Sequence, residues 1–318
     1  MEYKNLGKTK LKVSQVGMGV LNIGWSQLNL PIKDGAKIIK YALKRGINFF
    51  DTAEYYRTYD YIREALKNGE YDPIIASKSL SSSYEGMKTA IEDCRKALNK
   101  DCIEIFLLHE VRQAPDYENR TGALSALKEA QRKGHIIHIG LSTHYSDVCE
   151  MAAENKDMEI IFPLINFKGL GIRRGNGPGR KEEMERAIKL AGKNGKGVFL
   201  MKAFGGGNLT PYYAEALNYA RNLKGVDSIM LGFGKTEEID NAVDFFEGKL
   251  PANFQPDTKE KRMHIDPGDC EGCGACIKIC PNKAIYFNKS MTATIDSKLC
   301  ITCGYCAPAC PVRAIIMY

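Results

Sequence analysis

The chain has 318 residues and a formal net charge of +7, and it is 44% hydrophobic and 26% charged. This length favours two domains over one, and the balance of apolar and charged residues excludes a wholly disordered chain. The segment Met1–Lys8 is not apolar, so we expect no signal peptide, and no run approaches the ~18 apolar residues of a membrane span. We therefore expect a cytoplasmic protein that does not enter a membrane.

Apolar or β-branched runs alternate with amphipathic segments along residues 1–250. We expect strands over 13–18, 48–52, 74–77, 104–108, 137–141, 160–165, 197–202 and 228–231. We expect helices over 34–45, 84–98, 123–133, 181–193 and 237–246. Such a series of strand–helix units predicts an α/β fold, a (β/α)8 TIM barrel. A doubly wound sheet is the alternative, but the G-x-G-x-x-G pattern after the first strand fails at Asn22.

Four polar residues lie at or just after the ends of the expected second, third and fourth strands, where barrels gather catalytic groups. They are Asp51, Tyr56, Lys78 and His109. A carbonyl that accepts a hydride needs a proton donor, and a free tyrosine has a pKa of about 10. We expect the lysine to lower that pKa, the aspartate to hold the lysine, and the histidine to bind the substrate oxygen. Each residue alone could be structural, but the four together predict a catalytic group.

The same segment resembles the aldo-keto reductase superfamily over roughly residues 1–250. The resemblance rests on YKNLGKT at 3–9, DTAEYY at 51–56, ASK at 76–78 and IFLLH at 105–109. It implies hydride transfer between NAD(H) or NADP(H) and a small-molecule carbonyl or alcohol. The family's catalytic tetrad maps onto Asp51, Tyr56, Lys78 and His109, and its tyrosine lies five residues after the aspartate, which selects Tyr56 over Tyr55.

Loops after strands seven and eight commonly hold cofactor phosphates in barrels. Our expected cofactor-binding residues, which include two after strand five, are Ser142, Thr143, Met201, Phe204, Gly205, Gly206, Gly234, Lys235 and Asn241. The glycines could instead serve only as turn residues. The chain departs from the family, which usually has Ser-Asn where Ser142-Thr143 stands, often has a stacking tyrosine at Met201, and has a strand-six glutamine with no counterpart here.

Several further residues near this end of the barrel have two readings. Glu237 and Glu238 stand near the family's 2′-phosphate contact, which favours NAD(H) over NADP(H). His144 either faces substrate or cofactor or packs in the fold. The glycine-rich basic segment 171–180 is read as a solvated mobile loop rather than a lid over an anion.

Eight of the 11 cysteines lie between Cys270 and Cys310, in two C-x2-C-x2-C-x3-C-P runs that begin at Cys270 and Cys300. This is the spacing of two-cluster ferredoxins, in which the fourth cysteine of each run ligates the other cluster. One 4Fe-4S cluster would then be held by Cys270, Cys273, Cys276 and Cys310, and the second by Cys280, Cys300, Cys303 and Cys306. Paired zinc sites are the alternative, and they fit this spacing poorly.

The segment over roughly 262–318 thus resembles a two-cluster ferredoxin domain. We expect a barrel over 1–250, a linker over 251–262 and a ferredoxin-like domain, a small α+β unit, over 263–318.

The two halves raise a problem of electron counting, because a hydride carries two electrons and each cluster accepts one, a mismatch that a flavin usually bridges. Three arrangements remain open. In the first, the barrel carries out carbonyl or alcohol chemistry beside structural or redox-sensing clusters. In the second, the clusters link a barrel-bound flavin, or another redox group, to an external ferredoxin-like partner. In the third, the protein is mainly an electron-transfer or docking module on a barrel that has lost hydride chemistry. The intact tetrad favours an oxidoreductase. The positive charge alone does not indicate nucleic-acid binding, since no motif for it is present.

Overall fold

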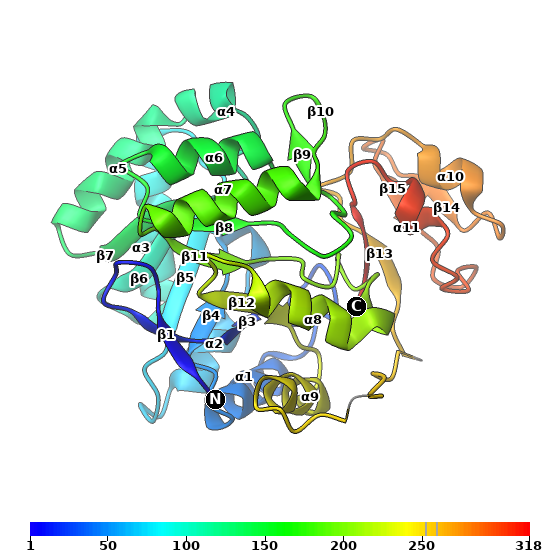
Figure 1. The fold of residues 1–318 in the computed structure, drawn as a ribbon, viewed down its shortest axis with the longest axis horizontal. Helices are drawn as coiled ribbons and strands as arrows, with labels where there is room; N and C mark the ends of the chain where they lie inside the picture. Colours follow the sequence, from blue (N-terminus) through cyan, green and yellow to red (C-terminus); the bar gives the residue numbers. More distant parts are fainter. Residues whose placement is uncertain (252, 259) are drawn as a thin grey trace.

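The computed structural model describes residues 1–251, 253–258 and 260–318. A closed barrel of parallel strands surrounded by helices is followed by a small second unit (Figure 1). The barrel strands, in chain order, are β3 (Val16–Gly19), β4 (Phe49–Asp51), β5 (Ile74–Ser79), β6 (Ile103–Leu108), β7 (Ile136–Thr143), β8 (Ile160–Pro163), β11 (Gly197–Leu200) and β12 (Ser228–Gly232). The last strand pairs with the first, with Ile229 opposite Val16. This closure confirms the (β/α)8 barrel and excludes the doubly wound sheet.

The start of the first expected strand was wrong. Val13 and Ser14 belong to a hairpin of β1 (Tyr3–Asn5) and β2 (Lys12–Ser14) that precedes the barrel. The chain turns at this point because the Ser14 amide donates to the Asn48 side chain at 2.7 Å and its hydroxyl donates to the Val16 carbonyl at 2.7 Å. These side-chain bonds replace the ladder of a continuous strand.

Amphipathic helices cover the outside of the barrel. In the described part of the chain they are α1 (Ile32–Lys44), α2 (Tyr59–Leu66), α3 (Tyr84–Leu98), α4 (Ala114–Glu118), α5 (Thr121–Arg132), α6 (Ser146–Glu154), α7 (Lys181–Lys193), α8 (Tyr213–Asn222) and α9 (Thr236–Phe246). The sequence sets their ends, as in α3, where the Ser83 hydroxyl accepts from the Gly86 amide at 3.1 Å and Asn99 is left-handed. None of the described helices has the length and apolarity needed to cross a bilayer.

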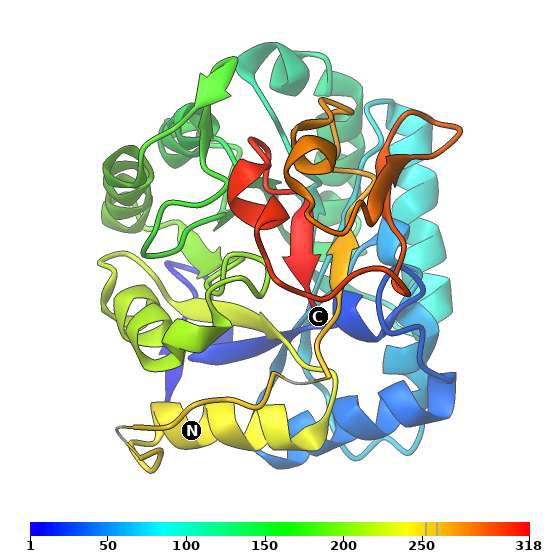
Figure 2. The same cartoon turned by 90° about the vertical axis from the view of Figure 1, so that its right-hand side faces the viewer.

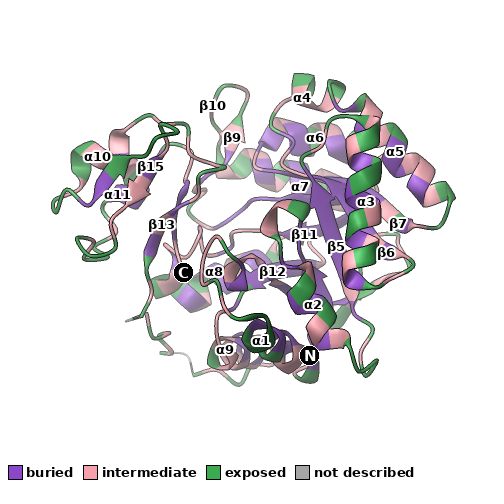
Figure 3. Cartoon of the chain, turned by 180° about the vertical axis from the view of Figure 1, so that it is seen from behind, coloured by how far each residue is buried: buried purple, intermediate pink, exposed green. Residues whose placement is uncertain are grey.

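The interior of the barrel is filled by apolar side chains. The strands around it are buried (Figure 3). Phe199 stacks on Phe162 with ring centroids 4.1 Å apart and meets Phe49 edge-on at 4.8 Å. Leu6 from the turn of the N-terminal hairpin joins this cluster. Because the interior is packed, the chemistry of the barrel is confined to its mouth, where the strand ends and the following loops meet.

The second unit is built from two halves of similar structure. Strand β13 (Met263–Ile265) pairs with β16 (Ile315–Met317), and β14 (Ile285–Phe287) pairs with β15 (Ala293–Ile295), both antiparallel. Two short helices, α10 (Ala275–Ile279) and α11 (Cys306–Ala309), contain the third cysteine of each run, Cys276 and Cys306. Apolar residues such as Ile265, Ile285 and Ile315 form its own core together with buried cysteines.

This unit is docked on the barrel mouth, at the carboxyl ends of the strands (Figure 2). The Met317 amide donates to the Gly206 carbonyl at 2.7 Å, and the Asn208 side chain donates to the Ile315 carbonyl at 2.9 Å. Gly207 has φ +85°, and a Cβ there would lie 2.0 Å from the Met317 oxygen. The glycines after β11 therefore allow the last strand of the chain to approach the loop backbone.

The segment 171–180, expected to be a mobile loop, forms a small hairpin of β9 (Arg173–Arg174) and β10 (Gly177–Pro178). It lies beside the second unit, since Arg173 is 3.7 Å from Glu271.

Candidate active site and cluster-binding sites

The fold brings the four tetrad residues together at the barrel mouth. Asp51 ends β4, Lys78 lies in β5 and His109 follows β6. Tyr56 ends the short helix η2 (Glu54–Tyr56), which lies in the loop after β4. Neighbouring parallel strands place their carboxyl ends side by side, which is why residues separated by 58 positions from Asp51 to His109 meet here.

Lys78 and Asp51 form a buried ion pair. The Lys78 Nζ lies 2.6 Å from Asp51 Oδ1 and 2.7 Å from the Thr52 carbonyl oxygen, and the two side chains are only 1% and 7% exposed. Burial raises the pKa of Asp51 and lowers that of Lys78, and their mutual attraction opposes both shifts. The pair keeps a cation fixed beneath the barrel mouth.

Tyr56 lies over this cation, with the Lys78 Nζ 4.6 Å from the centre of its ring. Its pKa is raised well above 10, first by burial and then by the carboxylates of Asp51, Asp266 and Asp269. The expectation of a lowered pKa does not hold in this structure, because burial, and then the carboxylates around the phenol, disfavour its ionised form. Tyr56 is consequently a protonated group at neutral pH.

His109 meets Tyr56 edge to face, with ring centroids 5.5 Å apart. Its amide donates to the Ser79 carbonyl at 2.9 Å and its carbonyl accepts from Arg120 at 2.7 Å, which fixes the backbone. Burial and the nearby Lys78 hold its pKa well below 6.5, so the imidazole is neutral. Among the described residues, its buried Nδ1 atom has no hydrogen-bond partner, an uncommon state that leaves a polar atom free for a ligand.

A charged cluster that the sequence analysis did not find lies next to the tetrad. Lys202, just after β11, pairs with Asp269 of the second unit at 2.8 Å. Oxygen and nitrogen atoms of Glu110, His144 and Asp269 lie within 4.8 Å of one another. The structure thus places His144 with charged groups from both halves of the chain.

The surroundings set the protonation of this cluster. Burial, with the nearby Lys202, lowers the pKa of His144 to about 3. Burial and the Asp269 carboxylate raise the pKa of Glu110 to about 6. Burial would raise the pKa of Asp269, but the surrounding cations, of which Lys202 acts most, lower it by more, so its pKa is lowered. The carboxylate of Asp269 is therefore ionised and is matched by the Lys202 cation.

A cavity of about 410 Å³ opens between the loops after β11 and β12, within the size range of small-molecule sites. Of the expected cofactor-binding residues, Phe204, Gly206, Lys235 and Asn241 line it. Lys202 and Lys261 add two further cations, and the carboxylates that line the cavity are those of Glu237, Glu238, Asp257 and Asp266. The size fits a small-molecule cofactor, and the lysines would meet its anionic groups in exchange for their present carboxylate partners.

The other expected cofactor residues are not among those that line this cavity. The Ser142 hydroxyl accepts from the Glu110 amide at 2.8 Å, and the Thr143 hydroxyl donates to the Val111 carbonyl at 2.6 Å. The Gly234 amide donates to Glu238 at 2.7 Å, and Glu238 also pairs with Lys261. Both hydroxyls at the end of β7 are thus engaged by backbone groups. Met201 and Gly205 also lie outside the lining residues, which include Gly207 and Thr210 instead.

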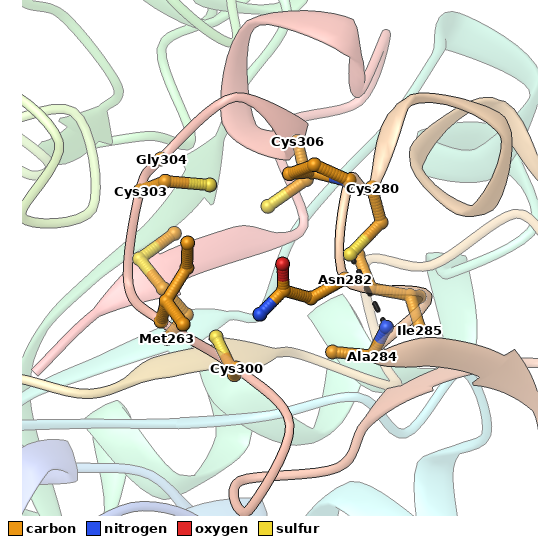
Figure 4. Close-up of a pocket in the computed structure, with 11 residues that line it drawn as sticks. Met263, Cys280, Asn282, Ala284, Ile285, Cys300, Cys303, Gly304 and Cys306 are labelled. Atoms are coloured by element: carbon orange, nitrogen blue, oxygen red, sulfur yellow. Dashed lines mark hydrogen bonds between the residues drawn. The ribbon is translucent and has the colours of Figure 1, made fainter.

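The cysteines gather in two sets. Cys280, Cys300, Cys303 and Cys306 line one small cavity, with Met263 and Ile285 beside them (Figure 4). The Ala284 amide donates to the Cys280 sulfur at 3.3 Å. These four residues are the expected ligands of one cluster, and the fourth comes from the other half of the repeat. All 11 cysteines are free thiols.

The other four cysteines of the repeat, Cys270, Cys273, Cys276 and Cys310, form the second set. Burial raises the pKa of the Cys276 thiol, and the neighbouring Cys310, Cys270 and Cys273 raise it further. The Ala293 amide donates to the Cys270 sulfur at 3.4 Å. Sulfurs grouped by fours, with backbone N–H donors beside them, fit cubane clusters better than isolated thiols.

Comparison with known proteins agrees with both halves of the chain. Residues 15–218 match the model of the aldo/keto reductase family, and residues 269–314 match that of a 4Fe-4S dicluster domain. The chain is 22% identical over 284 residues to L-galactose dehydrogenase from Arabidopsis thaliana, covering 76% of this chain and 87% of that protein. It is 24% identical over 217 residues to an uncharacterized oxidoreductase of Bacillus subtilis, covering 64% of this chain and 68% of that protein.

Among solved structures, an aldo-keto reductase from Bacillus halodurans in its holo form is similar to this chain. The TM-score is 0.64 with 21% identity, and the match covers 79% of this chain and 92% of that one. This likeness supports the barrel fold.

Proposed function

This chain belongs to the aldo/keto reductase family and is an oxidoreductase with an iron–sulfur domain, and we propose that it interconverts a small carbonyl compound and its alcohol with NAD(H) or NADP(H). The observation that carries the proposal is the buried Asp51–Lys78 pair beneath Tyr56, next to a neutral His109. In the reductive direction, carbonyl, NAD(P)H and one proton become alcohol and NAD(P)⁺. The nicotinamide, when bound, would supply the hydride.

The chain's own residues would manage the proton and the charge. Tyr56, protonated at neutral pH, donates its hydroxyl proton to the carbonyl oxygen as negative charge develops there. The phenolate that remains is stabilised by the fixed Lys78 cation, which Asp51 and the Thr52 carbonyl hold in place. His109, neutral and with an unpaired buried nitrogen, orients the substrate oxygen.

The cavity between the β11 and β12 loops is our proposed nicotinamide cofactor site. Lys202, Lys235 and Lys261 would face the phosphates, and Phe204 and Asn241 would contact the remainder of the cofactor. The Glu237 carboxylate beside this cavity favours NAD(H), because it would repel a 2′-phosphate. Of the remaining expected contacts, Ser142, Thr143 and Gly234 would bind the cofactor only after exchange of their present partners. Met201 and Gly205 would contact it from outside the present cavity lining.

The two sets of cysteines would hold two 4Fe-4S clusters that transfer electrons or stabilise the fold. We take residues 1–250 as the barrel domain, 251–262 as the linker and 263–318 as the ferredoxin-like domain. Eight cysteines that serve as cluster ligands require a compartment that keeps thiols reduced, such as the cytoplasm.

One observation favours a second function. The hydroxyls of Ser142 and Thr143, at the end of β7, are bonded to backbone groups, so the amide of a nicotinamide would lack the partners expected there. In this alternative, a barrel-bound flavin exchanges electrons through the clusters with a redox protein partner.

One preparation separates the two functions. The protein is purified without oxygen, and its iron, sulfide and bound organic cofactor are measured by chemical analysis, absorbance and mass spectrometry. Nicotinamide-linked reduction of a carbonyl panel supports the first function, and stoichiometric flavin supports the second. Tyr56→Phe removes the proposed proton donor and should slow the carbonyl reduction. Tyr55→Phe is its matched control, since it removes the neighbouring phenolic hydroxyl of the same loop.

A further inference from the structure

The ferredoxin-like unit sends one loop into the barrel mouth, and a single aspartate of that loop reaches a barrel lysine. The Asp269 carboxylate lies 2.8 Å from the Lys202 Nζ, and the two side chains are 12% and 23% exposed. Asp269 directly precedes the cluster ligand Cys270. The Lys202 ammonium of the barrel is thus within hydrogen-bond distance of Asp269, the residue that precedes the cluster ligand Cys270.

The internal repeat shows that this aspartate is not needed to build a cluster loop. Asp266 and Asp296 correspond, and both make the same turn. The Asp266 side chain accepts from the Gly268 amide at 2.9 Å, and that of Asp296 accepts from the Lys298 amide at 2.8 Å. Three residues further along the repeat, however, Asp269 corresponds to Leu299, which is 50% exposed. The carboxylate is therefore specific to the loop that faces the barrel.

Lys202 connects this loop to the cavity. Its backbone is left-handed, with φ +57°, an uncommon conformation for a residue with a Cβ. Its side chain lines the cavity assigned above to the cofactor. Arg112 supports the same loop, since it donates to the Gly268 carbonyl at 3.2 Å and pairs with Glu110 at 3.1 Å. The charges around Asp269 are thus held from two barrel loops, those after β6 and β11.

We propose that Lys202 is a positioning residue that, through Asp269, sets the reduction potential of the cluster held by Cys270, Cys273, Cys276 and Cys310 and links it to occupancy of the barrel cavity. The inference rests on the proposed clusters. Reduction adds one negative charge to a cluster, and net local charge is one determinant of its potential. The Lys202 cation offsets the Asp269 carboxylate next to Cys270, which favours the reduced state.

Linkage makes the effect reciprocal. An anion in the cavity that binds the Lys202 ammonium weakens its compensation of Asp269, so the potential of this cluster falls. By the same free-energy cycle, the anion binds more weakly after the cluster is reduced. Binding in the barrel cavity and reduction of the cluster would therefore influence each other without electron transfer between the two sites.

The test is a potentiometric titration of the anaerobic full-length protein followed by electron paramagnetic resonance. We expect Lys202→Met to shift one of the two one-electron steps to lower potential and Asp269→Asn to shift the same step to higher potential. The double variant should return near the wild-type value, since net charge is restored. The other step should stay in place throughout, and it serves as the check that each variant is folded. Lys133→Met, which removes an exposed lysine paired with Glu129 at 2.6 Å, is the control.

ADP-ribose, which is anionic and cannot transfer hydride, is the probe for the cavity. Saturating ADP-ribose should lower the same step in the wild type and leave it unchanged in Lys202→Met. The inference is overturned if both single variants leave both steps in place, or if both steps move together. If calorimetry detects no binding of ADP-ribose, the proposed nicotinamide function fails, while the variants without ligand still decide the role of Lys202. Zinc in place of iron would overturn both.

Discussion

Lys78 Nζ lies 2.6 Å from Asp51 Oδ1, and this ion pair is buried from solvent at the end of two neighbouring barrel strands. A charge pair in such a place costs desolvation energy that hydrophobic side chains would not. The site retains it, and the lysine lies directly beneath the ring of Tyr56. We interpret the pair as a fixed group of charges at the bottom of the active site, beneath Tyr56.

Breaking the pair should destabilise the fold. Lys78→Met leaves the Asp51 carboxylate buried without a cation, which should lower the free energy of unfolding by about 3–5 kcal/mol. The double variant Asp51→Asn/Lys78→Met removes the unpaired charge and should recover part of the loss. Denaturant titration measures both. Lys133→Met, on the surface, should cost less than about 1 kcal/mol, and an equal loss in the two lysine variants would contradict the assignment.

The pH dependence of carbonyl reduction follows from two shifted groups. The pKa of His109 is well below 6.5, so the imidazole stays neutral as the pH falls through 6.5. The pKa of Tyr56 is well above 10, so the phenol keeps its proton as the pH rises through 10. We expect a pH–rate profile without a His109 break near 6.5 or a Tyr56 break near 10. A break near 6 that is absent from Glu110→Gln would belong to Glu110, whose pKa is raised to about 6 by burial. A break that disappears only in His109→Gln would show that His109 titrates normally.

Docking of the C-terminal strand depends on the absence of a side chain at Gly207. In Gly207→Ala the new methyl group would meet the Met317 carbonyl oxygen, 2.0 Å from the ideal Cβ position, so the strand must move away. Limited proteolysis should then cut the linker 251–262 faster than in the wild type. Gly134→Ala is the matched control, because Gly134 also has a positive φ, +73°, but open space around its Cβ position. Equal cleavage of both variants would show that backbone strain, rather than docking, is responsible.

Crossed ligation of the clusters can be tested by counting iron. In Cys273→Ser/Cys310→Ser both substitutions affect one expected cluster, so about half of the iron should remain. In Cys303→Ser/Cys310→Ser the two substitutions lie in the same half of the repeat but affect different clusters, so nearly all iron should be lost. Cys149→Ser, which removes a buried thiol of α6, should change nothing. The opposite order of the two double variants would show that each half holds its own cluster.

Much of this architecture follows from local sequence patterns. Alternating strand and helix segments predict the barrel, and the spacing of Asp51, Tyr56, Lys78 and His109 predicts that they meet, because strand ends share one rim. Cysteine spacing predicts the two sulfur sets, including the exchange of Cys280 and Cys310. These features depend on short-range order or on repeat symmetry.

The contacts between the two halves could not be predicted in the same way. Lys202 and Asp269 are 67 positions apart and meet only because the ferredoxin-like unit docks on the barrel mouth. The repeat carries a signal at this loop, since Asp269 stands where the other half has Leu299. The second role of the glycines after β11 could not be predicted either. Gly206 and Gly207 line the cavity, and they also contact the C-terminal strand. The raised pKa of Tyr56 also depends on Asp266 and Asp269 from the docked unit.

The most direct test of the central claim is transfer of deuterium from NADH or NADPH deuterated at C4 to a carbonyl substrate, read by mass spectrometry of the alcohol. We expect deuterium on the former carbonyl carbon with the wild type and with Tyr55→Phe, and a rate lower by roughly 100- to 10,000-fold with Tyr56→Phe. Full transfer by Tyr56→Phe would contradict its role as proton donor. Anaerobic protein that carries stoichiometric flavin and transfers no deuterium across the panel would contradict the nicotinamide-linked function itself.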